Sequence, residues 1–316
     1  MELSEAKGRL ARVREAVHTA VVGRDALLDQ VLVGLLADGH LLLEDLPGLG
    51  KTLTAKSFAR SLGLGFARVQ FTADLLPQDI TGGEFFDAKS AEFRFRPGPI
   101  FTNILLADEI NRAPPKVQSA LLEAMQEYQV TSERRTYPLP RPFLVLATEN
   151  PLELEGTYPL PEAQLDRFLM RLTVGYPTEA EEREILARRR ARGRDEADVP
   201  QALTAEEFRA LQALVETIEV DPALEGYAVA LVGATRADPR AEVGASPRGS
   251  LALLKIARAR ALLEGRSYVV PDDMKAHAVA GLAHRIVVKP EPWIRGVRGK
   301  EIVASAVERT NVPKVG

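Results

Sequence analysis

The chain has 316 residues, 46% of them hydrophobic and 27% charged, so it can bury the core of one large domain or two medium ones. It has no cysteine, which excludes disulfides and thiolate metal sites, and its four histidines lack metal-ligand spacing. No apolar run approaches the ~20 residues that span a bilayer, and the charged N-terminus lacks a signal-peptide core, so we expect no membrane span and a cytoplasmic location. The net charge of −3 does not favour a nucleic-acid partner.

Two amphipathic helices are expected at the start of the chain. Apolar residues recur at spacings of three and four from Leu3 to Ala20, and a second apolar stripe runs from Leu28 to Leu36. A turn at residues 21–25 separates the two segments. We expect the first helix to pack onto the main body rather than to form a coiled coil.

The stretch Glu44–Thr52 lies between an apolar, strand-like run and a helix-compatible segment. This is the setting of a phosphate-binding P-loop, in which backbone N–H groups face the phosphates, a Lys reaches the β- and γ-phosphates, and a Ser or Thr hydroxyl holds Mg²⁺. Those parts are present as Gly48, Gly50, Lys51 and Thr52. Asp45 stands where the usual pattern has its first glycine, so a tight turn with a solvated Lys is the alternative.

A second decisive stretch begins with the apolar run Ile104–Ala107, which has the pattern of a strand covered on both faces. It leads directly into Asp108 and Glu109. At the carboxyl edge of a parallel sheet, Asp108 would hold Mg²⁺ through its water shell, and Glu109 would take a proton from an attacking water. Solvated strand-end carboxylates are the alternative, and the loop upstream favours the catalytic interpretation.

Two further polar residues occupy suggestive positions. Asn150 follows the apolar run Phe143–Ala147, where it either orients the attacking water or forms a turn before proline. Arg248 lies in the first turn of a helix that Ser246 caps, where a cation opposes the helix dipole. The unfavourable interaction with the helix dipole would be offset if Arg248 reached an anion, either a bound phosphate or a nearby carboxylate.

The pattern becomes helical beyond Tyr176, with capping boxes beginning at Thr178 and Thr204 and without strand alternation. Two hairpin-like segments precede this change, one within residues 79–99 and one at residues 129–142. The first contains the alternation Phe93–Arg96, whose aromatic side chains either hold a partner or fold back onto the protein.

From Val21 to about Arg285, the order of motifs resembles the MoxR family of AAA+ ATPases. The resemblance is carried by residues 44–52 (EDLPGLGKT), 96–100 (RPGPI), 107–116 (ADEINRAPPK), 121–127 (LLEAMQE), 147–151, 156–168 and 245–248. The family's loop also lacks the first glycine. The resemblance implies an α/β fold, with a three-layer αβα core of a five-stranded parallel sheet and hairpin insertions over residues 1–176 and a smaller all-α lid domain over residues 177–316.

The resemblance also assigns the site residues. Nucleotide would be bound by the Walker A loop and by an adenine-side turn, comprising Val22, Gly23, Pro47, Gly48, Leu49, Gly50, Lys51, Thr52 and Leu53. Thr52 and Asp108 would hold the metal. Glu109 would be the Walker B base, and Asn150 would be sensor 1. Arg167 would be an arginine finger, and Arg248 would be sensor 2. Arg171 is the alternative finger.

The resemblance further implies a homo-oligomer, usually a hexameric ring, that binds ATP with Mg²⁺ between subunits and releases ADP and phosphate. It implies chaperone-like remodelling or maturation of protein clients, often with a partner that has a von Willebrand factor A domain. Two alternatives remain open. A nucleic-acid motor of the helicase-loader kind is disfavoured by the net charge, and a nucleotide-gated scaffold with negligible turnover is disfavoured by Glu109.

Overall fold

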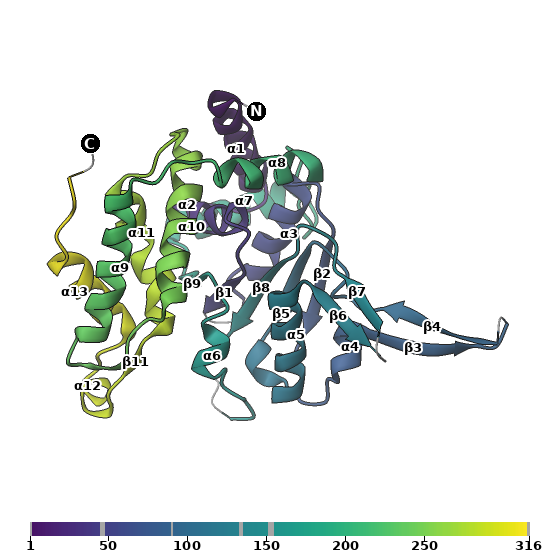
Figure 1. The fold of residues 1–316 in the computed structure, drawn as a ribbon. Coiled ribbons are helices and arrows are strands. Elements are labelled where there is room, and N and C mark those ends of the chain that lie inside the picture. Colours follow the sequence, from purple (N-terminus) through teal and green to yellow (C-terminus); the bar gives the residue numbers. More distant parts are fainter. Residues whose placement is uncertain (1, 45–47, 90, 133–134, 151–154, 315–316) are drawn as a thin grey trace.

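A five-stranded parallel sheet lies at the centre of the larger part of the molecule (Figure 1). The computed structural model describes residues 2–44, 48–89, 91–132, 135–150 and 155–314. In spatial order, the strands are Phe66–Gln70 (β2), Ile104–Asp108 (β5), Leu144–Glu149 (β8), Leu41–Glu44 (β1) and Met170–Thr173 (β9). Every neighbouring pair is parallel, so the carboxyl ends of the strands share one edge, where open α/β sheets bind ligands.

Helices cover both faces of this sheet, which explains why its strands are nearly continuous apolar runs. On one face, Leu41 and Leu43 belong to a hydrophobic cluster with helices Leu3–His18 (α1), Asp25–Leu36 (α2) and Lys51–Ser61 (α3). On the other face, Leu42 and Leu105 belong to a second cluster with helices Pro77–Thr81 (α4) and Pro115–Glu127 (α5). This three-layer core confirms the predicted fold class.

The chain beyond Tyr176 forms a mainly helical region, and its later helices lie beside β9 in Figure 1. Its helices are Glu179–Arg192 (α7), Ala205–Val215 (α8), Pro222–Ala237 (α9), Pro247–Glu264 (α10), Pro271–Leu282 (α11), Pro290–Ile294 (α12) and Gly299–Arg309 (α13). The side chains of Thr178 and Thr204 form the predicted capping boxes. Buried residues of α8 to α11 and α13 join the hydrophobic cluster of α1, α2 and α3, so this region packs directly on the core.

A short antiparallel pair, Ala241–Val243 (β10) and Val287–Val288 (β11), lies among these helices. The sequence pattern predicts helices alone in this region, and this is wrong for β10 and β11, because strands this short show no alternation. The helix Glu162–Leu165 (α6) and the 3-10 helices Ile110–Arg112 (η1) and Ala283–Arg285 (η2) complete the described elements. No helix in the described part of the chain is both long and apolar enough to cross a bilayer.

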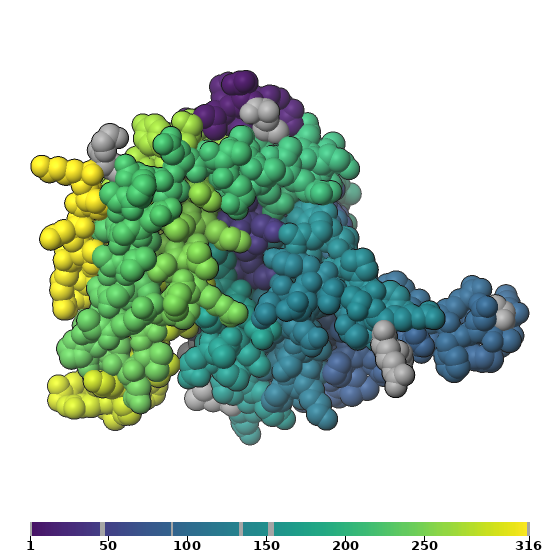
Figure 2. All heavy atoms as spheres, in the orientation of Figure 1, coloured from purple at the N-terminus to yellow at the C-terminus, as the bar shows by residue number. Residues whose placement is uncertain are grey.

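Two antiparallel hairpins extend from the core: Gly82–Asp87 (β3) with Glu92–Pro97 (β4), and Gln129–Ser132 (β6) with Arg135–Pro138 (β7). The first projects well beyond the rest of the surface (Figures 1 and 2). Phe95 folds back, because its ring stacks on Tyr137 with 3.9 Å between centroids. Phe86 and Phe93 stay 56% and 68% exposed further along the hairpin. Phe95 therefore folds back onto the protein, whereas a partner for Phe86 and Phe93 stays a prediction.

Candidate functional site

A cavity of about 260 Å³, the carboxyl-edge cavity, brings three predicted motifs together at the carboxyl ends of the strands. It is lined by Gly48, Leu49, Gly50, Lys51, Thr52, Arg68, Gln70, Asp108, Glu109 and Asn150. Gly48 and Gly50 have φ values of 83° and 80°, a region that glycine adopts readily. Lys51 begins α3, so the N-terminus of this helix lies at the cavity, as in a phosphate site.

Two predicted loop residues are not placed in this cavity. Pro47, together with the unusual Asp45, lies outside the described residues. Leu53 is exposed and lines a neighbouring cavity along α3.

The carboxylate of Asp108 is held from two sides. Its Oδ2 accepts hydrogen bonds from Arg68 Nε at 3.0 Å and Nη2 at 2.7 Å, and its Oδ1 accepts one from Thr148 Oγ1 at 2.6 Å. Asp108 and Thr52 line the cavity beside Lys51 and offer the hard oxygen ligands that Mg²⁺ prefers. Within the described ranges, no cluster of three or more His, Cys, Asp or Glu could hold a metal unaided. The hydroxyl of Thr52 and the carboxylate of Asp108 fit a Mg²⁺ ion that arrives with a phosphate ligand.

Glu109 follows β5 with a positive φ of 56°, an uncommon conformation for a residue with a side chain. Its backbone N–H donates to Thr148 Oγ1 at 2.8 Å. Its Oε2 accepts a hydrogen bond from Gln70 Nε2 at 2.6 Å and lies 3.0 Å from Arg112 Nε. Residues with strained backbone conformations are common at functional sites, and here the conformation places the Glu109 carboxylate at the cavity wall.

Asn150 is buried at the cavity wall, directly after β8. The neighbouring Glu149 pairs in register with Glu44 of β1, and burial, with a further contribution from Glu44, raises the pKa of Glu149. Arg171 opposes this shift, and its Nε lies 3.3 Å from Glu44 Oε2. Arg171 is thus engaged with carboxylates of its own chain.

The predicted adenine-side turn lies against the phosphate loop. Val22 is buried, and Gly23 has a φ of 62°. A Cβ atom on Gly23 would lie 1.7 Å from Glu181 Oε1, so a larger residue would displace that side chain. Arg24 donates its backbone N–H to Glu181 Oε1 at 3.3 Å and its guanidinium to the Leu49 carbonyl. These contacts join the turn, the first turn of α7 and the loop.

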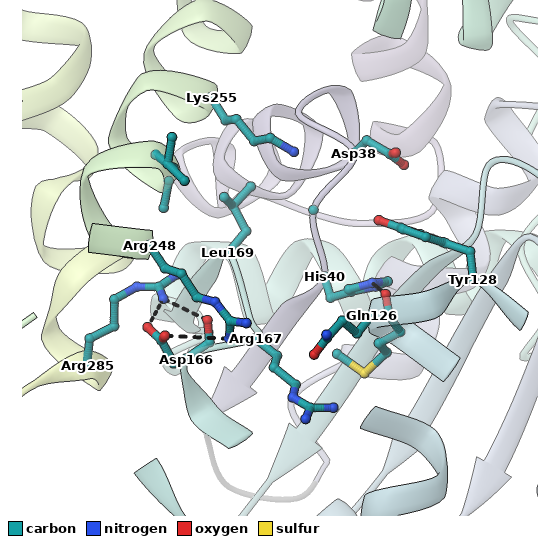
Figure 3. A pocket seen from close by; sticks show the side chains of 14 residues that line it. Asp38, His40, Gln126, Tyr128, Asp166, Arg167, Leu169, Arg248, Lys255 and Arg285 are labelled. Carbon is teal, nitrogen blue, oxygen red and sulfur yellow. Dashed lines mark hydrogen bonds and ion pairs between the residues drawn. The ribbon is translucent and has the colours of Figure 1, made fainter. Parts of the chain in front are cut away.

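Arg167 and Arg248 lie in a second cavity, of about 290 Å³, between the core and the helical region (Figure 3). We name it the amino-edge cavity, because it is also lined by His40 and Leu169, which precede β1 and β9. The two cavities lie at opposite ends of the parallel strands. The lining residues of the two cavities do not overlap.

Both arginines have partners in the amino-edge cavity. Arg167 Nη1 donates to the Leu122 carbonyl at 2.6 Å. Arg248 Nη1 lies 3.7 Å from Asp166 Oδ2, and the Arg248 side chain is 54% exposed. Of the two anions considered for Arg248, the nearby carboxylate is therefore its partner within the chain.

Comparisons with known proteins agree with this geometry. Residues 40–170 match the ATPase family associated with various cellular activities (AAA), and residues 233–306 match the AAA lid domain. YeaC of Bacillus subtilis is 47% identical over 304 residues, covering 96% of this chain and 95% of the relative. Chaperone MoxR1 of Mycobacterium tuberculosis is 44% identical over 315 residues, covering 97% and 83% respectively. The chain belongs to the MoxR family of AAA+ ATPases.

The fold of this MoxR-family protein is also that of a crystal structure of a protein from Cytophaga hutchinsonii. The two superimpose with a TM-score of 0.92 at 38% identity, over 99% of this chain and 97% of the other. The family resemblance drawn from the sequence motifs is therefore confirmed.

The sequence motifs do not identify three residues at or beside the carboxyl-edge cavity: Arg68 and Gln70, which line it, and Arg112, which contacts Glu109. Arg68 and Gln70 alternate along β2, and the strand register places Gln70 beside Asp108. This alternation was a signal in the sequence. It identifies site residues only once β2 is known to pair with β5.

Proposed function

We propose that this MoxR-family protein hydrolyses ATP to ADP and phosphate at sites shared by neighbouring subunits of a hexameric ring. One observation carries the proposal: Arg167 and Arg248 line a cavity at the opposite ends of the strands from the cavity of Lys51, Asp108 and Glu109. Cations that stabilise a transferred phosphoryl group have to contact it. A second copy of the chain would therefore bring these arginines to the phosphates.

The carboxyl-edge cavity has the groups that phosphoryl transfer to water requires. Thr52 and Asp108 would hold Mg²⁺, which neutralises phosphate charge when bound. Lys51 and the backbone N–H groups of the loop would bind phosphate oxygens. The water oxygen bonds to the γ-phosphorus while the bond to the ADP oxygen breaks, Asn150 orients this water, and Glu109 takes its proton.

Glu109 has to change its contacts before it acts as the base. Its Oε2 accepts a hydrogen bond from Gln70 and lies 3.0 Å from Arg112 Nε, so this oxygen is occupied by two protein groups rather than open to a water. We infer that Glu109 leaves these partners when a neighbouring Arg167 approaches. Hydrolysis would then be confined to the assembled ring.

We further propose that hydrolysis drives chaperone-like remodelling of protein clients, with a partner that has a von Willebrand factor A domain. A relative that aligns with 97% of this chain is named a chaperone. The projecting β3–β4 hairpin presents Phe86 and Phe93, whose rings pair edge to face at 5.4 Å between centroids. An exposed aromatic pair suits an apolar segment of a client.

Phosphate release from mixed subunits tests the shared site. Glu109→Gln removes the base and Arg167→Ala removes the cation, so each variant alone should hydrolyse ATP poorly. A mixture forms interfaces at which an intact Glu109 meets an intact Arg167, and activity should recover. Two assembled, ATP-binding variants that show no recovery when mixed would refute the shared site.

The client role is tested by replacing both exposed hairpin aromatics, Phe86 and Phe93, with serine. Basal ATP hydrolysis should stay at the wild-type level, whereas binding of clients held by the Glu109→Gln trap should be lost. Val229→Ser, which changes an exposed apolar residue of α9, is the control. Loss of nucleotide binding in the hairpin variant would contradict this division of labour.

A further inference from the structure

Arg285, at the end of η2 in the helical region, holds the segment that carries Arg167. Its side chain is 3% exposed. Its Nη1 donates to the backbone carbonyl of Asp166 at 2.7 Å, and its Nη2 donates to that of Phe168 at 2.8 Å. Asp166 and Phe168 are the residues on either side of Arg167. One buried guanidinium therefore fixes the backbone from which Arg167 projects.

The same guanidinium also forms an ion pair with the core. Arg285 Nη1 contacts Asp166 Oδ1, and Arg285 Nε donates to the Gly281 carbonyl at 2.8 Å. Burial lowers the pKa of Arg285, and the Asp166 carboxylate opposes that shift. The planar fork of an arginine can bind two carbonyls and a carboxylate together, which the compact ammonium of a lysine does poorly.

Asp166 extends this contact to Arg248. The carboxylate accepts hydrogen bonds from Ser246 Oγ at 3.1 and 3.3 Å, and Ser246 caps the helix whose first turn contains Arg248. Arg248 itself lies 3.7 Å from Asp166. Figure 3 shows Asp166 linked to both Arg248 and Arg285, with Arg167 extending away from this group.

The side chain of Arg167 is held less firmly than its backbone. Its Nη1 donates to the Leu122 carbonyl, but its buried Nε has no hydrogen-bond partner among the described residues. An incomplete set of hydrogen bonds to neutral groups is readily exchanged for a phosphate, because charge-assisted hydrogen bonds are stronger. The hydrogen bonds of Arg285 to the Asp166 and Phe168 carbonyls involve none of the atoms that such an exchange would change.

We propose that Arg285 is a positioning residue that fixes the Arg167 segment to the helical region, so that Arg167 and Arg248 reach the neighbouring subunit's nucleotide as one unit. This inference rests on the shared site proposed above. A movement of the helical region in one subunit then moves both cations relative to the phosphates in the next. Misplacing such a group by ~1 Å can lower a rate by ~10²-fold.

A matched control separates positioning from simple stabilisation of the helical region. Arg266 and Asp273 form another ion pair in this region, with Nη2 to Oδ1 at 2.6 Å and Nη1 to Oδ2 at 2.9 Å. The side chain of Asp273 is also nearly fully buried. Neither residue lines the amino-edge cavity.

The experiment compares Arg285→Ala with Arg266→Ala. Arg285→Ala should lower kcat for ATP hydrolysis by ~10²-fold. KM and the affinity for a fluorescent ADP analogue should not change, because the carboxyl-edge cavity of the variant subunit is intact. Arg266→Ala should keep kcat. Arg285→Ala subunits mixed with Glu109→Gln subunits should regain activity, since those neighbours bring a correctly held Arg167. Mixing with Arg167→Ala subunits should give no recovery.

Two milder variants keep the inference testable if Arg285→Ala does not fold. Asp166→Asn keeps the backbone carbonyl that Arg285 binds, and Arg285→Lys keeps the charge; each should lose part of kcat with the same mixing pattern. Equal loss of kcat in Arg266→Ala would overturn the inference. The inference would also be overturned if Arg285→Ala subunits mixed with Glu109→Gln subunits regained no activity while the reference mixture, Arg167→Ala with Glu109→Gln, did. Failure of that reference mixture would refute the shared site and this inference with it.

Discussion

The two cavities beside the central sheet are assembled differently. The carboxyl-edge cavity takes its lining from the phosphate loop, from β2 and β5 and from the residue after β8, all of which belong to the core. The amino-edge cavity combines Arg167 of the core with Arg248, Lys255 and Arg285 of the helical region. The half of the proposed site that contains Asp108 and Glu109, the acidic half, is therefore lined by core residues alone. The cationic half depends on how the helical region docks onto the core.

The cationic half should show the largest effect. Arg167→Ala should lower the rate of ATP hydrolysis by ~10³–10⁵-fold, because an arginine supplied by a neighbouring subunit usually raises kcat by that factor. The measurement is steady-state phosphate release, with assembly checked by size-exclusion chromatography. The matched control is Arg171→Ala, which removes a guanidinium that pairs with Glu44 in its own chain. If Arg171→Ala were the more damaging change in intact assemblies, Arg171 would be the finger.

The acidic half should show the next largest effect. Glu109→Gln should lower hydrolysis by ~10²–10⁴-fold, because the amide cannot take the proton from water. Binding of ATP should persist, since the phosphate loop and Asp108 are unchanged. Glu206→Gln, at an exposed position of α8, is the control. Turnover at the wild-type level in Glu109→Gln would exclude Glu109 as the base.

The sequence predicts the acidic half better than the cationic half for a physical reason. The loop, Asp108 with Glu109, and Asn150 each directly follow an apolar strand, so the signal lies within a few residues. Arg285 and Asp166 are 119 residues apart, and their contact depends on the docking of two regions. Arg68 and Asp108 are 40 residues apart, and their contact depends on the order of strands. The local pattern of apolar and polar residues shows neither how the two regions dock nor in which order the strands lie.

The same limit applies to Arg248. The sequence places it at a capped helix start, and the family resemblance names it a sensor, but neither says which subunit's phosphate it faces. Only the position of α10 beside the amino ends of β1 and β9 bears on that question.

His40, which lines the amino-edge cavity, should make stability depend on pH. Burial lowers the pKa of His40 to about 4, against contributions from the Met125 carbonyl and Asp38 that raise it. Its Nδ1 accepts the Val145 N–H at 3.0 Å, and its Nε2 lies 3.0 Å from the Met125 carbonyl, so a second ring proton would oppose the first of these contacts. The unfolded chain therefore binds that proton more readily than the folded chain does.

The sign of the effect follows from this difference. Stability should be full above the unfolded pKa of about 6.5 and should fall as the pH drops towards 4, by about 2 kcal/mol at pH 5. Urea unfolding at pH 7 and pH 5 measures this loss, and His40→Gln should reduce it relative to His18→Gln, a change at a partly exposed site. Because the pKa of His277 and of His284 is also lowered by burial, some pH dependence should remain. An equal loss in both variants would contradict the role of His40.

Arg68→Ala should have the smallest effect, a change in nucleotide affinity. It tests whether Arg68 competes with the metal for Asp108 or contacts the nucleotide. Its guanidinium binds Oδ2 of Asp108, an oxygen that a metal would use. An ion pair with an exposed partner is worth up to about 1 kcal/mol, so Arg68→Ala should strengthen Mg²⁺-dependent binding of a fluorescent ADP analogue by up to about fivefold. Binding in EDTA should not change. Arg94→Ala, which removes an exposed ion pair from the β3–β4 hairpin, should leave both unaltered. Weaker Mg²⁺-dependent binding in Arg68→Ala would mean that Arg68 contacts the nucleotide rather than competing with the metal, and the carboxyl-edge cavity would then contain a second cation, besides Lys51, for the phosphates.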